Sequence, residues 1–224
     1  YSIPVKDRDL MDRWLLSKLN KLIKDVNSAY EEFDLNKVTK LIVPFLNDDL
    51  SNWYIRGNRR RFWDSELTES KKAVYLTLYE ALVILCKLCA PITPFLTEEI
   101  YQNLTGEESV HLANFPKYNE EYIDLELEEK MDSVRTITSL GRKIREEVKI
   151  KVRQPLSEAI LDGKKKAKLE SYVPLIIEEL NVKNVVFMDD LSEFMNIEVK
   201  PNFKLCGKIF GSRMKDVQEA QKQA

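Results

Sequence analysis

The chain has 224 residues, 44% of them hydrophobic, which is enough for one sizeable core or two smaller ones. Because 35 basic side chains nearly balance 37 acidic ones, the overall charge does not attract nucleic acid, and only local basic patches can do so. Six glycines and a lack of low-complexity sequence predict an ordered, helix-rich domain, and three cysteines, an odd number, predict a reducing, cytoplasmic setting without a disulfide framework.

Helical periodicity dominates the first two thirds of the chain. The first helix is predicted from about Asp7 to Tyr30. Asp34 is the expected N-cap of a second helix that continues to about Trp63 and bends at Pro44, which lacks a backbone donor. The buried stripe of the first helix is expected to be Leu15, Leu19, Leu22, Ile23 and Val26.

Prolines divide the next helical segment. A third helix is predicted to begin near Ser70 and to stop at Pro91. A fourth, short helix is predicted to begin at Pro94, with Thr93 as its N-cap. The long apolar run across this junction contains these prolines and Lys87, so it is too interrupted to span a bilayer.

A fifth helix is predicted from Asp124 to about Val148, because apolar residues recur there in steps of three and four and so share one seam. Short connections between long amphipathic helices predict a mainly α fold, an antiparallel up-and-down helical bundle over residues 1–150. The seam is expected to contain Leu127, Met131, Val134, Ile137, Leu140, Ile144 and Val148.

After the bundle the pattern changes to βαββα, which predicts a small α/β module over residues 151–224. Strands are expected at 156–161, 183–188 and 196–201, with a helix between the first two and another at the end. Pro155 ends the preceding helix, so the boundary is expected between Ile150 and Leu156.

No catalytic residue and no metal ligand is predicted. Cys86 and Cys89 form a single CxxC inside a helix, with only His111 to join them, which favours buried thiols over a zinc site. His111 is expected to be a loop or packing residue. Without a nucleophile–base pair or a glycine-rich phosphate loop, the sequence offers no active site.

A first basic cluster lies in residues 50–63. Trp53, Arg56 and Arg60 follow helical spacing, with Arg59 alongside, and an aromatic plane between guanidinium groups suits unstacked RNA bases and phosphates. The alternative places Trp53 and Trp63 in the core, which we favour for the tryptophans. In this alternative the arginines bridge to Asp48, Asp49 or Glu66. Trp53 and Tyr54 are expected to shape a platform.

A second basic cluster follows the fifth helix. Arg135, Arg142, Arg145 and Lys149 lie at i, i+7, i+10 and i+14, and from residue 142 to residue 153 there are six basic residues against two acidic ones. Such a stripe can follow a phosphate backbone, although a solvated helix face is the alternative. The predicted RNA contacts in both clusters are Arg56, Arg59, Arg60, Arg142, Lys143, Arg145, Lys149, Lys151 and Arg153.

Several segments closely resemble the region that follows the catalytic core of isoleucyl-tRNA synthetases. They are "DLSNWYIRGNRRRFW", "LCKLCAPITPFLTEEIYQNL", "SVHLANFP" and "IKVRQPL", and similarity extends from "DRWLLSKLN" to "KPNFKLCGKIFG". The segment "APITPFLTEEIY" is less specific, since valyl and leucyl enzymes carry relatives of it. The chain begins with Tyr1, and we expect it to be a fragment of a longer protein.

The resemblance implies an anticodon-binding helical bundle followed by a small α/β module. Its partners would be the anticodon stem and loop of tRNA(Ile) and the missing catalytic domain of the same chain; no membrane is implied, and a monomer is expected. The parent enzyme, an isoleucine–tRNA ligase, would use ATP and magnesium in a domain absent here, as is the editing domain, so the fragment should be inactive alone and needs no cofactor. The alternatives are a helical protein-interaction module or the equivalent region of a valyl- or leucyl-tRNA synthetase.

Overall fold

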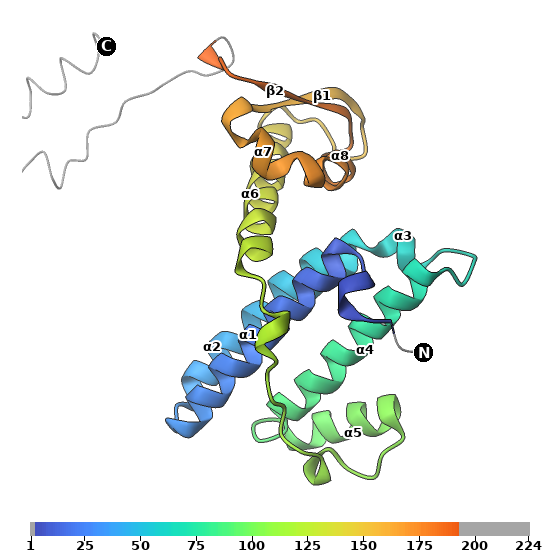
Figure 1. Cartoon of the computed structure of the whole chain (residues 1–224), viewed down its shortest axis with the longest axis vertical. Coiled ribbons are helices and arrows are strands. Elements are labelled where there is room, and N and C mark those ends of the chain that lie inside the picture. The colour runs from blue at the N-terminus through green and yellow to red at the C-terminus, as the bar shows by residue number, and fades with distance from the viewer. Residues whose placement is uncertain (1–2, 193–224) are drawn as a thin grey trace, which may run out of the picture.

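A computed structural model of the chain describes residues 3–192. It is mainly α-helical, with a helical bundle joined by one long helix to a small α/β unit (Figure 1), which confirms the predicted fold class. Within this part of the chain, every helix is too short or too polar to cross a bilayer.

The central helix of the bundle is α1, Leu10–Glu31, which packs against α2, the following π-helical segment, α4 and α6. It starts after a short 3-10 turn at Val5–Asp7, because the side chain of Asp9 accepts a hydrogen bond from the backbone N–H of Met11 and so caps it. The predicted buried stripe is confirmed: Leu15, Leu19, Leu22, Ile23 and Val26 all belong to the core.

The predicted second helix is divided into three pieces: α2 (Leu35–Pro44), the π-helical segment η2 (Phe45–Ile55) and α3 (Arg59–Phe62). Asp34 caps α2 as expected, by accepting a hydrogen bond from the N–H of Lys37. The π-helical hydrogen bonding begins directly after the proline and widens the helix. Side chains beyond it therefore do not lie on the helix faces that a regular α-helical spacing predicts.

The next two helices are α4, Glu69–Cys89, and α5, Pro94–Thr105. Thr68 caps α4 through its hydroxyl, and Pro94 opens α5 as predicted. The predicted cap by Thr93 is wrong in one respect: its hydroxyl donates to the carbonyl oxygen of Cys89 at 3.3 Å and does not cap α5. Two short 3-10 turns follow, Val110–Leu112 and Glu120–Tyr122.

Helix α6, Leu125–Glu147, begins in the bundle and ends in the α/β unit (Figure 1). Asp124 caps it by accepting a hydrogen bond from the N–H of Leu127. The predicted apolar seam is buried as far as Ile137, but its second half is exposed, because α6 has by then left the other helices of the bundle. The exposed seam residues are Leu140, Ile144 and Val148.

The α/β unit pairs two parallel strands, β1 (Leu156–Asp162) and β2 (Val182–Met188), with Leu156 opposite Val182. The connection contains α7 (Lys166–Leu169) and α8 (Val173–Leu180), each preceded by a 3-10 turn. The predicted third strand and last helix lie outside the described residues.

Helix α8 packs on α6 with very little space. A Cβ atom on Gly141 would come within 2.6 Å of the Cδ2 atom of Leu180, so any larger residue at this position would force Leu180 to move. Leu169, Ile176 and Leu180 belong to the same hydrophobic cluster as the α1 stripe. The bundle and the α/β unit therefore share one core, which fixes the position of α8 beside α6.

Candidate nucleic-acid interface

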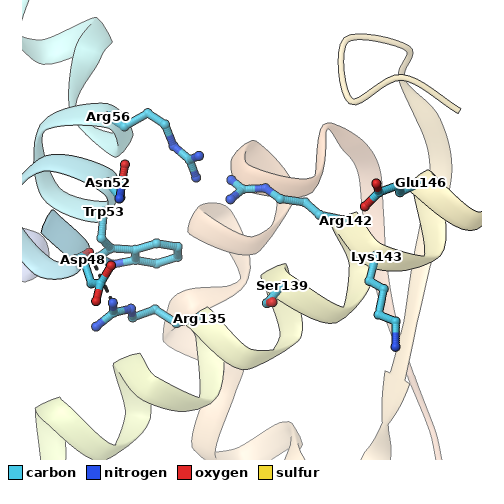
Figure 2. Close-up of a pocket in the computed structure, with 9 residues that line it drawn as sticks. All are labelled: Asp48, Asn52, Trp53, Arg56, Arg135, Ser139, Arg142, Lys143 and Glu146. Carbon is cyan, nitrogen blue, oxygen red and sulfur yellow. Dashed lines mark hydrogen bonds between the residues drawn. The ribbon is translucent and has the colours of Figure 1, made fainter. Parts of the chain in front are cut away.

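A groove with a volume of about 520 Å³ runs between η2 and α6 (Figure 2). Arg56 and Trp53 come from one wall, and Arg135 and Arg142 come from the other. We call this site the basic groove. It is lined by Asp48, Asn52, Trp53, Arg56, Arg135, Ser139, Arg142, Lys143 and Glu146.

Two arginines from opposite walls share one acid at one end of the basic groove. Glu179, from α8, accepts a hydrogen bond from the Nη2 atom of Arg56 at 3.2 Å and another from the Nη2 atom of Arg142. Its side chain is 8% exposed. Burial lowers the pKa of the Arg142 guanidinium, the charge of Arg56 adds to this effect, and Glu179 opposes it.

Arg135 is held in place on the floor of the groove. Its guanidinium lies 2.6 Å from the Oδ1 atom of Asp49 and 5.7 Å from the centre of the Trp53 ring, a cation–π distance. Trp53 is buried, as favoured from the sequence, and supports this wall. Tyr54 is fully buried and donates a hydrogen bond to Asp12 at 2.6 Å, so it supports the wall from behind.

The first basic cluster is not one surface. Arg61 pairs with the buried carboxylate of Asp12 at 2.7 Å, whereas Arg60 is exposed and pairs with Glu178 at 3.2 Å. Arg59 is exposed and forms no ion pair with any residue from 3 to 192. Trp63 was expected in the core, but it is 85% exposed, because α3 ends at the preceding residue and the chain turns outward.

The predicted cationic stripe on α6 is also interrupted. Arg145 was expected to contact RNA, but it is only 3% exposed. Its guanidinium donates hydrogen bonds to four backbone carbonyl oxygens, at 3.3 Å to Lys151, 3.0 Å to Gln154, 2.7 Å to Leu180 and 3.1 Å to Asn181. Two of these oxygens lie at the C-terminus of α8, where the helix dipole favours a positive charge. We therefore remove Arg145 from the predicted surface contacts.

The clamp made by Arg145 shapes a segment that we call the basic loop, residues 149–153. A second hydrogen bond, from the amide of Asn181 to the Val152 carbonyl at 2.9 Å, fixes the same segment. Lys149, Lys151 and Arg153 are exposed on it and form no ion pair with any part of the chain that the structure describes.

The basic loop adjoins the basic groove. A second hollow, of about 400 Å³, is lined by Lys149 and Lys151 and shares Arg142 and Glu146 with the groove. Lys143, at the groove's edge, is exposed and only loosely paired with Glu147 at 4.0 Å. The structure thus brings Arg56, Arg142, Lys143, Lys149 and Lys151 to one connected surface, on which anionic polymers can bind over several contacts.

The two cysteines in α4 are poor ligands and nucleophiles. Burial raises the pKa of the Cys86 thiol and raises that of Cys89 to about 11. Among residues 3–192, no three His, Cys, Asp or Glu side chains are grouped to hold a metal ion. His111 is exposed in the turn at Val110–Leu112.

Reasoning from the sequence missed Glu179 and Asn181, and it named Asp49 only as a partner of the arginines in residues 50–63, not of Arg135. Glu179, Asp49 and Asn181 are far in sequence from the arginines and carbonyls they contact. A helical acid such as Glu179 has no local pattern that sets it apart from any other solvated glutamate. Only the packing of α8 on α6 places it between two arginines.

Comparison with known proteins places this surface in context. The family profile described as "Anticodon-binding domain of tRNA ligase" matches residues 12–160. The chain is 44% identical to an isoleucine–tRNA ligase of Bacteroides thetaiotaomicron over 97% of its own length and 20% of the relative's. It is 43% identical to that of Chlamydia pneumoniae (98% and 22%) and 44% identical to that of Clostridium tetani (91% and 20%). The chain spans about a fifth of the length of these relatives.

Proposed function

Because this chain belongs to the family of anticodon-binding domains of tRNA ligases, we propose that it binds the anticodon stem and loop of tRNA(Ile) as one part of an isoleucine–tRNA ligase. The observation that carries this proposal is the connected surface of the basic groove and the basic loop, where three cations have no acidic partner among residues 3–192.

The basic loop suits the RNA backbone. Lys149, Lys151 and Arg153 alternate along an exposed segment whose backbone is held by Arg145 and Asn181, so little backbone conformational entropy is lost when they bind. Each phosphate that they neutralise releases counterions, which makes binding sensitive to salt. The proposed contact residues are Arg56, Arg59, Arg60, Arg142, Lys143, Lys149, Lys151 and Arg153.

Catalysis belongs to the rest of the parent enzyme in this proposal. The parent would attach isoleucine to tRNA(Ile) with ATP and magnesium bound outside this chain, and the isolated chain would bind RNA without catalysing the reaction. Gripping the distal arm would orient the acceptor end in the active site, so binding energy contributes to specificity. We further propose that the protein acts in the cytoplasm as a monomer.

Binding assays with RNA hairpins test the proposal. A hairpin with the tRNA(Ile) anticodon should bind more tightly than hairpins with altered anticodons, and the affinity should fall steeply with salt. The double variant Lys149→Glu, Lys151→Glu should weaken binding, whereas the matched variant Lys21→Glu, Lys40→Glu, on exposed sites of α1 and α2, should not. Equal affinity for every hairpin, or a salt-independent affinity, would instead support a protein-interaction module.

A further inference from the structure

The end of the basic groove where Arg56 meets Arg142 has an unusual charge arrangement. Figure 2 shows the two guanidinium groups extending toward each other from opposite walls. Two like charges in this position repel, and Glu179 behind them is the acid that holds both. One carboxylate and two guanidiniums leave the trio with one net positive charge.

Most of the hydrogen-bonding capacity of these arginines is unused. A guanidinium has five N–H donors, and each of the two gives its hydrogen bond to Glu179 through Nη2 alone. Their other donors have no partner among the described residues. Both side chains line the groove, so these donors are accessible from it.

The acids that line the groove limit where an anion can bind. Figure 2 shows Asp48 beside Arg135, and Glu146 on the far side of Arg142. Arg135 already has Asp49 as its partner at 2.6 Å. An anion is therefore repelled from the floor and the outer edge, and the favourable position lies between Arg56 and Arg142.

We propose that Arg56 and Arg142 together form a binding site for one backbone phosphate of the RNA, and that Glu179 is the positioning residue that keeps their guanidinium groups convergent. A phosphodiester carries one negative charge and several acceptor oxygens, which match the net charge of the trio and its unused planar donors. The charge of Arg56 is one of the causes that lower the pKa of Arg142, and a second anion between the two guanidinium groups offsets this repulsion. This inference rests on the proposed function, because it names a subsite within the same surface.

The salt dependence of hairpin binding tests whether one phosphate is shared. Arg56→Gln and Arg142→Gln should each weaken binding about tenfold at low salt and reduce the slope of log K against log salt by about 0.7–0.9, the value for one phosphate. The double variant should reduce the slope by no more than either single one. A reduction twice as large, or an unchanged slope in the single variants, would overturn the shared site.

Phosphate-ethylation interference tests the same site directly. Ethylation of several phosphates should weaken binding of the wild-type chain. One of these phosphates, the same one in both cases, should become insensitive with Arg56→Gln or Arg142→Gln, while those at the basic loop stay sensitive. If the pattern is the same for wild type and variants, the site does not exist. Arg56→Lys and Arg142→Lys keep the charge beside Glu179 and lose the planar guanidinium, so the same phosphate should become insensitive to ethylation. These lysine variants replace the glutamine variants if thermal unfolding shows that the glutamine variants do not fold.

The role of Glu179 has a matched control in the next residue. Glu179→Gln and Glu178→Gln remove the same charge from adjacent positions of α8, but Glu178 pairs with the exposed Arg60. Ethylation of the phosphate assigned to Arg56 and Arg142 should no longer weaken binding of Glu179→Gln, but it should still weaken binding of Glu178→Gln, whatever the change in overall affinity. Persistence in both would refute the positioning role. Failure of the proposed function would look different, since the wild-type chain would not prefer the cognate hairpin.

Discussion

Replacing Arg145 tests the claim that a buried arginine holds the basic loop in place. Its guanidinium is almost fully buried and donates hydrogen bonds to four carbonyl oxygens in two segments, the basic loop region and the end of α8. Arg145→Gln keeps part of the side-chain volume but cannot reach all four oxygens. Some buried carbonyl groups would then be left without a donor.

The expected loss of stability in Arg145→Gln follows from the hydrogen bonds that are lost. A hydrogen bond from a charged donor contributes about 1.5–3 kcal/mol, and each buried polar group left unsatisfied costs about 1–3 kcal/mol. Because glutamine can replace only some of the four hydrogen bonds, we expect Arg145→Gln to lower the free energy of unfolding by about 3–5 kcal/mol. The neighbouring exposed variant Lys149→Gln, on the same segment, should change it by less than about 0.5 kcal/mol.

Urea denaturation followed by circular dichroism measures this free energy, and hydrogen exchange locates the effect. In Arg145→Gln, the amide of Gln154, which donates to the Lys151 carbonyl at 2.9 Å, should exchange faster while amides in α1 stay protected. A loss below about 1 kcal/mol with unchanged exchange would show that the clamp is not needed and would refute the reasoning.

Three further predictions concern packing, backbone strain and pH. Gly141→Ala should lower the free energy of unfolding by about 1–3 kcal/mol in urea titrations, because the new methyl group overlaps Leu180; an unchanged midpoint would contradict the close α6–α8 packing. Lys149 has a φ of 58°, so Lys149→Gly should raise the free energy of unfolding by up to about 1 kcal/mol while weakening hairpin binding. A decrease in both stability and affinity would contradict the backbone strain at this residue. The thiol pKa of Cys89 is raised to about 11 in the folded chain, so its contribution to stability is present below pH ~8.5 and is lost as pH rises through 11. The difference in melting temperature between the wild type and Cys89→Ala should therefore shrink as pH rises from about 8 to 11. A difference that stays constant over this range would contradict the raised pKa.

Periodicity and capping chemistry predicted most of the bundle, because both are local. The apolar steps of α1 and the carboxylate of Asp34 are visible in short stretches, and the structure agrees with both predictions. The π-helical segment after Pro44 could not be predicted in the same way. A widened turn keeps an apolar pattern similar to that of an α-helix, so the spacing of Trp53 and Arg60 suggested one face that the structure does not form.

In the candidate site, too, local features could be predicted from the sequence and long-range contacts could not. Sequence located the cations, because charge density is visible in a short segment, but it did not distinguish exposed from buried ones. Arg145 is buried and Lys149 is exposed although both fit one helical stripe, because α8 covers the first and the chain leaves the helix before the second. Such differences depend on where α8 packs, and that contact joins residues far apart in sequence.

Lysine footprinting with intact tRNA(Ile) tests the central claim most directly. Acetylation rates of lysines on the described surface would be measured by mass spectrometry with and without the tRNA. Binding at the basic groove and basic loop predicts strong protection of Lys143, Lys149 and Lys151, while Lys40 on α2 keeps its full rate. Protection centred on Lys40, or equal rates at all four lysines with bound tRNA, would contradict it.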